Sequence, residues 1–547
     1  MPHDLVIRGG TIIDGSGSPG ATGDVAIDGE RIAQVGGRAG AGKREIDATG
    51  LVVSPGFIDP HTHYDAQICW DHALTPSCWQ GITSVVMGNC GFTIAPCPPR
   101  GRERLMRMLE RVEGMSLAAL EKGITWSWES FPEYLDALAA SRPALNVACL
   151  IGHSALRYYV LDEEATERTA TGDEIERMRT ILREAMQAGA FGFSTSQAPT
   201  HWCGNGRPVP SRLATDEEVI ELGAVLGEFG RGVLEITAKD LTDAEVSVKL
   251  MRRSGRPLTY LGAALPETRA AFARARAEGM RVVPQTSCRP SLMDFKLDAG
   301  VIFDQLPCWG EVMRRKVSEL PALFKTAEFR RRFREDLVSD AVKFRIFKGD
   351  WGTVKITMTG DASRRNLIGK SIAELATEIK ADPVDAFFDV ALDDGLRTEF
   401  SYCLSGDEHR GPSLLDEDNM IGLSDAGAHL TLLADHAYTT YFLGRWIRER
   451  GLMPLEQGVR KLTQVPAQLF GIRERGALVE GYFADVTLFD PDRVIDLPTA
   501  LVYDLPGGGP RLLTRAEGIE SVIVNGQLTV ERGELSGANA GQVLRAS

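Results

Sequence analysis

Short runs of alternating apolar and polar residues, separated by glycine turns, open and close the chain. Near the start they cover residues 5–10, 24–29 and 31–35, and near the end they cover 484–490 and 519–526. Runs of this length between turn residues predict small antiparallel strands. Because both ends share this pattern, we expect them to pair into one small composite β-sandwich domain, formed by residues 1–55 and 475–547.

Continuous apolar runs recur through the middle of the chain, and helix-like segments follow them. Residues 173–188 and 216–229, for example, begin with Asp and carry apolar residues at three-to-four spacing. Strands that are buried on both faces of a parallel sheet have apolar runs of this kind. We therefore predict an α/β protein in which residues 56–474 form a (β/α)8 TIM barrel. The predicted barrel strands are 53–60, 84–90, 145–153, 191–195, 232–237, 258–263, 282–286 and 421–425.

The interval between the seventh and eighth predicted strands, residues 287–420, is longer than one helical crossover requires. We expect it to hold an insertion beside the active site, which could serve as a lid or as a contact between subunits. A homo-oligomer is therefore compatible with the sequence. The full length of 547 residues suits a barrel with such an insertion and one small extra domain.

The composition changes this picture little but argues against some partners. Hydrophobic residues make up 43% of the chain and charged residues 25%, as in ordinary globular proteins. The net charge of −14 argues against nucleic acid and anionic membranes, since both need clustered Lys and Arg. The chain has no long apolar run and no basic leader, and its nine cysteines lack paired spacing. These features predict a cytoplasmic protein.

The strongest candidates for chemistry are His61 and His63, at the end of the first predicted barrel strand. Residues two apart on a strand point to the same side, so both imidazoles could bind one metal ion. Barrel enzymes hold their active sites at the carboxyl ends of the strands, which is where this pair lies. Two hydrogen-bonded structural histidines are the alternative, and the position favours metal binding.

Several motifs, in order along the chain, resemble those of a known family. The segment from Pro55 to His63 resembles the first-strand motif of the amidohydrolase superfamily. The segment Gly88-Asn89-Cys90-Gly91-Phe92 narrows the resemblance to the N-acyl-D-amino-acid deacylase (D-aminoacylase) family. Residues 152–157, 189–195 and 423–429 follow in the expected order, and 476–485 resemble the segment where family members re-enter their β-domain.

This resemblance implies a zinc-dependent barrel hydrolase that deacylates N-acyl-D-amino acids. It makes Cys90 a metal ligand, in keeping with the affinity of thiolate for zinc, although a small buried side chain is the alternative. Asp425 ends the eighth predicted strand, where a carboxylate can bind the metal and shuttle a proton from the attacking water to the leaving nitrogen. A helix N-cap is the alternative for Asp425.

Two further histidines are candidates for supporting roles. His153 ends the third predicted strand and could contact the substrate or a metal ligand, with a buried structural histidine as the alternative. His429 follows the turn after Asp425 and could orient that carboxylate, with a plain surface histidine as the alternative.

The sequence departs from the family at two expected ligand positions. D-aminoacylases are expected to carry histidines at the ends of the fifth and sixth strands, but residues 232–239 and 258–263 contain none. One zinc ion is therefore favoured over two, held by His61, His63 and Asp425 with Cys90 or Glu235. Glu235 could instead pair with a buried cation.

An N-acyl amino acid also carries a carboxylate, which calls for a cationic partner. Arg289, Lys296 and Lys239 are candidates, although each is more typical of a surface ion pair.

Together these features predict a metal-dependent amidohydrolase that acts on C–N bonds other than peptide bonds in a small-molecule amide. Deacylation of an N-acyl-D-amino acid is the leading reaction. The missing histidines keep two alternatives open. One is hydrolysis of a cyclic amide, an imide or another amide that is not an amino-acid derivative, and the other is a non-catalytic scaffold that keeps the barrel.

Overall fold

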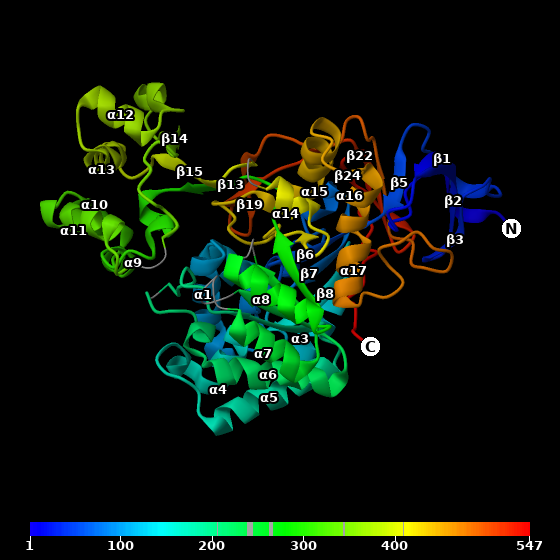
Figure 1. Ribbon diagram of the computed structural model, residues 1–547. Helices are drawn as coiled ribbons and strands as arrows, with labels where there is room; N and C mark the ends of the chain where they lie inside the picture. The colour runs from blue at the N-terminus through cyan, green and yellow to red at the C-terminus, as the bar shows by residue number, and fades with distance from the viewer. Residues whose placement is uncertain (205, 238–243, 262–265, 343–344, 408–409) are drawn as a thin grey trace.

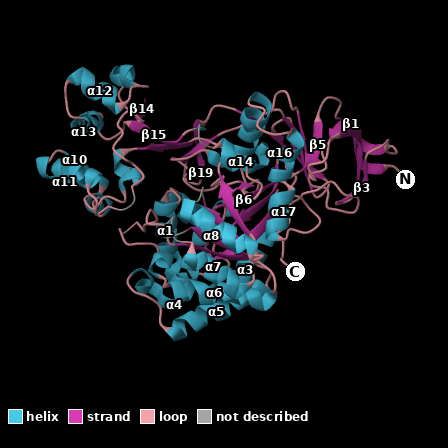
Figure 2. Ribbon diagram, in the orientation of Figure 1, coloured by secondary structure: helices cyan, strands magenta, loops and turns pink. Residues whose placement is uncertain are grey.

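A computed structural model describes the chain except for residues 205, 238–243, 262–265, 343–344 and 408–409, and except for the side chains of 266, 267, 299 and 301. It contains a central barrel, a sheet built from both chain ends, and an insertion (Figures 1 and 2). The predicted fold class is confirmed: an eight-stranded parallel sheet curls into a barrel, and the ends of the chain form a mostly β domain.

The barrel sheet has the strand order β6-β7-β8-β9-β10-β11-β12-β16, with all neighbours parallel. The ring closes where Thr62 bridges Ala426, next to a 2.7 Å hydrogen bond from the His63 amide to the Ala426 carbonyl. Each predicted strand overlaps one of these, although residues 262–263 of the sixth lie outside the described residues. The strands are β6 (Phe57–Thr62), β7 (Ile82–Met87), β8 (Asn146–Gly152), β9 (Gly192–Ser196), β10 (Val233–Thr237), β11 (Leu258–Leu261), β12 (Val282–Thr286) and β16 (Met420–Ile421).

The first predicted strand, 53–60, is divided in the structure. β5 (Val52–Pro55) belongs to the sheet of the chain ends, whereas β6 belongs to the barrel. Gly56 separates them, and a Cβ at this position would collide with the side chain of Thr83. Both segments are buried throughout and neither shows an alternation of apolar and polar residues, so the sequence pattern could not show the change of sheet.

The helices predicted over 173–188 and 216–229 are present to within one residue, as α5 (Gly172–Gln187) and α6 (Asp216–Phe229). Their N-caps are Thr171 and Thr215 rather than aspartates, because each hydroxyl accepts a hydrogen bond from a first-turn amide. The other helices that surround the barrel are α1 (Arg102–Val112), α2 (Leu117–Gly123), α3 (Phe131–Ser141), α4 (His153–Leu161), α7 (Glu245–Ser254), α8 (Pro266–Ala277), α15 (Tyr438–Tyr441), a π-helix (Phe442–Glu449), α16 (Leu455–Leu462) and α17 (Gln464–Phe470).

Both chain ends enter one nine-stranded sheet with the order β24-β23-β22-β17-β5-β1-β2-β3, and β4 pairs with β1. The ends meet where β5 runs antiparallel to β17. The division into 1–55 plus 475–547 and 56–474 stays a prediction. The strands are β1 (His3–Ile12), β2 (Ala21–Asp28), β3 (Arg31–Val35), β4 (Gly42–Asp47), β17 (Val486–Phe489), β22 (Ile519–Val524), β23 (Gln527–Glu531) and β24 (Glu534–Leu535), and two small ladders join β18 (Ile495–Asp496) to β21 (Ala516–Glu517) and β19 (Ala500–Leu505) to β20 (Gly509–Leu513).

The long interval between β12 and β16 folds around an aromatic core of its own, which includes Phe303, Trp309, Phe333 and Phe387. Figure 1 shows its helices, apart from the one that returns to the barrel, at the opposite end of the molecule from β1–β3. Its elements are a sheet in the order β13-β15-β14 and the helices α9 to α13, with α14 on the return to the barrel: β13 (Ser291–Phe295), β14 (Val354–Met358), β15 (Glu399–Ser405), α9 (Trp309–Met313), α10 (Leu320–Phe324), α11 (Ala327–Val338), α12 (Ile372–Ile379), α13 (Pro383–Asp393) and α14 (Gly411–Leu415).

Among the described residues, no helix has the length and apolar character needed to span a membrane.

Candidate metal centre

Three buried side chains converge at the carboxyl ends of the first two barrel strands. His61 lies in β6, His63 directly follows it, and Cys90 lies in the short 3-10 turn after β7. Their ligand atoms lie within 4.8 Å of one another. Cys90 has a φ of 54°, which is rare outside glycine and costs energy that functional sites often accept. The structure therefore brings together the His-x-His pair and the cysteine selected from sequence.

Asp425 completes the cluster from the segment after β16, next to the bridge between Thr62 and Ala426 that closes the barrel. Its Oδ1 lies 3.2 Å from His61 Nε2 and 3.7 Å from His63 Nε2. Burial opposes ionisation, but hydrogen bonds from His61 and His63, together with the charges of His61 and His429, hold the pKa of Asp425 well below its usual range. Its side chain is 16% exposed, whereas that of His61 is fully buried. Asp425 is thus an ionised group at the accessible side of the cluster.

Glu235 lies beside Cys90 at the core of the barrel. One of its carboxylate oxygens accepts a 2.7 Å hydrogen bond from the Cys90 amide, and burial raises the pKa of Glu235 to about 7. Burial, together with the charges of Glu235 and Asp425, raises the pKa of the Cys90 thiol. A divalent cation reverses this balance, because it deprotonates a coordinating thiol and offsets the buried carboxylates. The imidazole, thiolate and carboxylate donors therefore fit zinc.

The outer nitrogens of the two histidines have different surroundings. His61 Nδ1 is hydrogen-bonded to Gln285 Oε1 in β12 at 2.9 Å. His63 Nδ1 lies 3.3 Å from Glu113 Oε1 without forming a hydrogen bond among the described residues. An acceptor at Nδ1 favours the proton there and leaves Nε2 available for a metal ion, so Gln285 orients His61 for that role.

Sequence reasoning missed both of these supporting residues. Gln285 is fully buried near the end of the seventh barrel strand, and a polar residue at that point of an apolar run is a signal that could have identified it. Glu113 caps the end of α1 and is 1% exposed, with no motif around it. Burial raises the pKa of Glu113 well above its ordinary value.

His153 lies in a different network. Its Nδ1 is 2.8 Å from Thr195 Oγ1, and its Nε2 is 2.9 Å from Glu218 Oε1. Arg157 donates to both oxygens of Glu218 at 2.6 Å, and all of these side chains are buried. Because both ring nitrogens of His153 are occupied, this geometry favours a structural role over a substrate contact.

His429 stays a candidate for support of Asp425. Burial lowers the pKa of His429, while the charge of Asp425 opposes that effect. Sequence reasoning overlooked His201, whose ring packs edge-on against Phe92 at 5.1 Å, while Phe92 lies 6.5 Å from the His63 ring. His201 thus extends the wall of the site beyond β9.

The candidates for binding a substrate carboxylate are already engaged where the structure describes them. Arg289 pairs with Asp496 at 2.5 Å, and Lys296 pairs with Glu399 at 3.0 Å. Lys239 lies outside the described residues.

Similarity to known proteins shows the family to which the chain belongs. The sequence matches the amidohydrolase family over residues 44–318 and 412–530. The chain belongs to the amidohydrolase family. This amidohydrolase is 32% identical to a D-aminoacylase of Alcaligenes xylosoxydans xylosoxydans over 560 aligned residues, which cover 100% of the chain and 98% of the relative. The resemblance drawn from the motifs is confirmed.

Two solved structures match the amidohydrolase over its whole length. A crystal structure of N-acyl-D-glutamate deacylase from Bordetella bronchiseptica, with zinc and a phosphonate mimic of the tetrahedral intermediate, matches the amidohydrolase with a TM-score of 0.70, 28% identity and 100% coverage of each chain. A D-aminoacylase described as having a binuclear metal centre, with one-metal activation and second-metal attenuation, matches with a TM-score of 0.68, 28% identity and the same coverage. The amidohydrolase catalyses metal-dependent hydrolysis of C–N bonds other than peptide bonds.

Proposed function

We propose that this amidohydrolase is a zinc enzyme that removes the acyl group from N-acyl-D-amino acids. The observation that carries the proposal is the convergence of His61, His63, Cys90 and Asp425 at the carboxyl ends of the barrel strands. The similarity to a D-aminoacylase and to N-acyl-D-glutamate deacylase supports the choice of substrate.

One zinc ion is the proposed complement. His61, His63 and Cys90 would hold it together with Asp425, and Glu235 would contribute charge through its contact with the Cys90 amide. The described parts of β10 and β11 carry no histidine to complete a second site. Three or four protein ligands suffice for a catalytic zinc ion that keeps an open position.

The proposed chemistry divides between the ion and Asp425. When bound, zinc supplies Lewis-acid chemistry, which polarises a carbonyl and makes water more acidic. Asp425 is ionised and lies at the accessible side of the cluster, so it can take a proton from the attacking water. It then delivers that proton to the leaving nitrogen, and the products are a carboxylic acid and an amine. Gln285 keeps His61 in the required orientation through the hydrogen bond at Nδ1.

A substrate panel tests the proposal. Zinc-loaded protein is assayed with N-acetyl-D-amino acids, their L-forms and cyclic imides, and release of free amine or ring opening is followed. We expect the D-forms to be hydrolysed with kcat/KM of about 10⁴ M⁻¹s⁻¹ or more. Turnover restricted to cyclic imides would replace the proposal with a ring-opening amidohydrolase. Absence of turnover with every substrate would favour a non-catalytic scaffold.

A further inference from the structure

A cavity of about 510 Å³ lies at the end of the barrel opposite the metal centre. Most of its lining comes from the turns before β10, β11 and β12, and the rest from the end of α17 with the turn after it and from residues 546–547. The metal centre, in contrast, lies where the barrel strands end. The volume is within the range of small-molecule sites, which run from roughly 300 to 1,000 Å³.

Arginines dominate the charged lining of this cavity. Three of them lie in equivalent turns between a helix and the next barrel strand: Arg231 after α6, Arg256 after α7 and Arg281 after α8. In each turn the next strand begins within two residues of the arginine. Parallel strands begin at the same end of the barrel, so the three side chains gather there. Arg473, from the turn after α17, joins them. We refer to these four residues as the arginine cluster.

No acidic side chain of the described residues forms an ion pair with the arginine cluster. Arg231 donates to the Met186 carbonyl at 2.7 Å, Arg256 to the Gly230 carbonyl at 2.6 Å, and Arg281 to the Gln468 carbonyl at 2.9 Å. The one acidic side chain in the described lining, Glu278, is paired at 2.8 Å with an arginine outside the cavity, Arg252.

Burial works against the charged state here, and it lowers the pKa of both Arg256 and Arg281. The three carbonyls that accept these hydrogen bonds lie at or near the carboxyl ends of α5, α6 and α17. A helix carboxyl end carries about −0.5 charge, so capping of these ends explains part of the arrangement. Three such ends supply less negative charge than the four guanidiniums supply positive charge. In a protein with a net charge of −14, the side chains that line this cavity carry an excess of positive charge.

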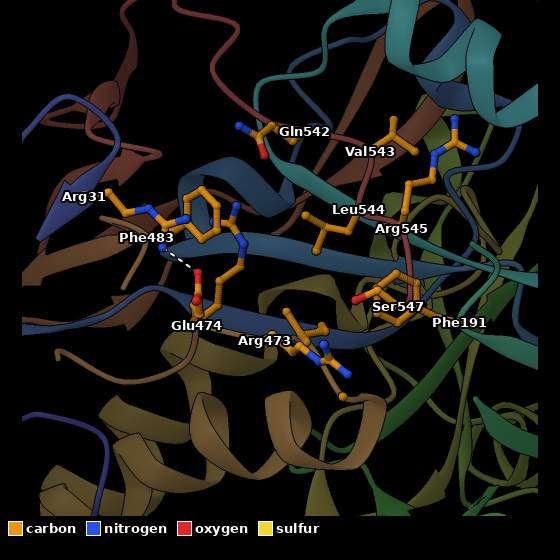
Figure 3. A pocket seen from close by; sticks show the side chains of 13 residues that line it. Arg31, Phe191, Arg473, Glu474, Phe483, Gln542, Val543, Leu544, Arg545 and Ser547 are labelled. Atoms are coloured by element: carbon orange, nitrogen blue, oxygen red, sulfur yellow. Dashed lines mark hydrogen bonds and ion pairs between the residues drawn. The ribbon is translucent and has the colours of Figure 1, made fainter. Parts of the chain in front are cut away.

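An adjoining cavity of about 390 Å³ gives an internal comparison (Figure 3). It shares Arg473 with the first cavity and adds Arg31, Arg475 and Arg545. Each of these three has an acidic partner, respectively Glu474, Asp485 and Asp136. The uncompensated charge therefore belongs to the arginine cluster, with Arg473 at the border between the cavities.

We propose that the arginine cluster binds a small phosphorylated anion, at a site separate from the metal centre. Guanidinium groups donate pairs of hydrogen bonds whose geometry matches phosphate oxygens. An anion with two phosphate groups carries enough charge and enough acceptor atoms for several arginines at once. The carbonyl contacts hold Arg231, Arg256 and Arg281 in place beforehand, which lowers the cost of ordering them on binding.

Calorimetric titration with pyrophosphate at constant ionic strength tests this proposal. The protein is first treated with a chelator and dialysed, so that pyrophosphate cannot bind through a metal ion at His61. We expect saturable binding with one site per chain, and we expect Arg473→Gln to weaken it about tenfold, as loss of a charged hydrogen bond does. Arg473 is exposed, so this substitution spares the core.

Arg38→Gln is the matched control, because Arg38 is also exposed but lies between β3 and β4 in the sheet of the chain ends. It should bind pyrophosphate as tightly as the native protein. The proposal is overturned if native protein shows no saturable binding, or if Arg473→Gln binds as tightly as Arg38→Gln. Citrate forms a further arm of the experiment, and binding as tight as that of pyrophosphate would overturn the assignment to phosphate.

Discussion

Replacement of Asp425 by asparagine is expected to lower kcat/KM by between roughly a hundredfold and ten-thousandfold, the range for loss of a positioned acid–base group. Asparagine has nearly the same shape but cannot accept the proton of the attacking water. His61, His63 and Cys90 remain as ligands in this variant, so it should still bind zinc. Initial rates with the best substrate of the panel, measured alongside metal content, provide the test.

Asp418→Asn is the control for this substitution, since its side chain is 55% exposed and pairs only with Arg276 among the described residues. It should leave both the rate and the metal content unchanged. An Asp425→Asn enzyme as active as the native one would contradict the role of Asp425 in proton transfer. Loss of zinc in proportion to loss of activity would make Asp425 a ligand without that role.

Replacement of Arg157 by alanine is expected to destabilise the protein by about 3–5 kcal/mol, the effect of leaving a buried charge without its partner. Arg157 and Glu218 are fully buried, and one guanidinium nitrogen of Arg157 lies 2.6 Å from both oxygens of Glu218. The substitution leaves Glu218 with His153 as its remaining side-chain partner among the described residues. The free energy of unfolding, from urea denaturation monitored by circular dichroism, measures the effect.

Arg107→Ala provides the comparison, because Arg107 is 54% exposed and pairs with Glu103 one helical turn away. Exposed pairs of this kind contribute less than about 1 kcal/mol. If Arg157→Ala were as stable as Arg107→Ala but lost activity, the network around His153 would serve catalysis rather than stability.

The barrel could be predicted because its strands are buried on both faces and therefore appear as apolar runs in the sequence. The same uniformity hid the division of residues 53–60, where the chain leaves one sheet and enters another at Gly56. Pairing of the two chain ends followed from their shared alternating pattern, and the β5–β17 ladder realises it. A local pattern thus indicates strands, but not the sheet to which each one belongs.

Some residues of the candidate site could be identified from the sequence, and others could not. His61, His63 and Cys90 belong to motifs near the ends of consecutive barrel strands, so their sequence context identified them. Glu113 reaches His63 from a turn after α1, a contact that only the folded chain creates. His153 also belongs to a motif, yet its partners Thr195 and Glu218 lie far along the chain, and sequence alone could not show that they occupy both ring nitrogens.

Elemental analysis of the native protein and of His61→Ala shows whether this cluster holds the catalytic metal ion, with His3→Ala as a control on the sheet of the chain ends. We expect about one zinc ion per chain in the native protein and in His3→Ala, as for an open site with three or four ligands. We expect His61→Ala to lose both the zinc and the hydrolysis of N-acyl-D-amino acids. A native protein that retains no metal and shows no turnover after zinc is added would rule out the proposed zinc hydrolase.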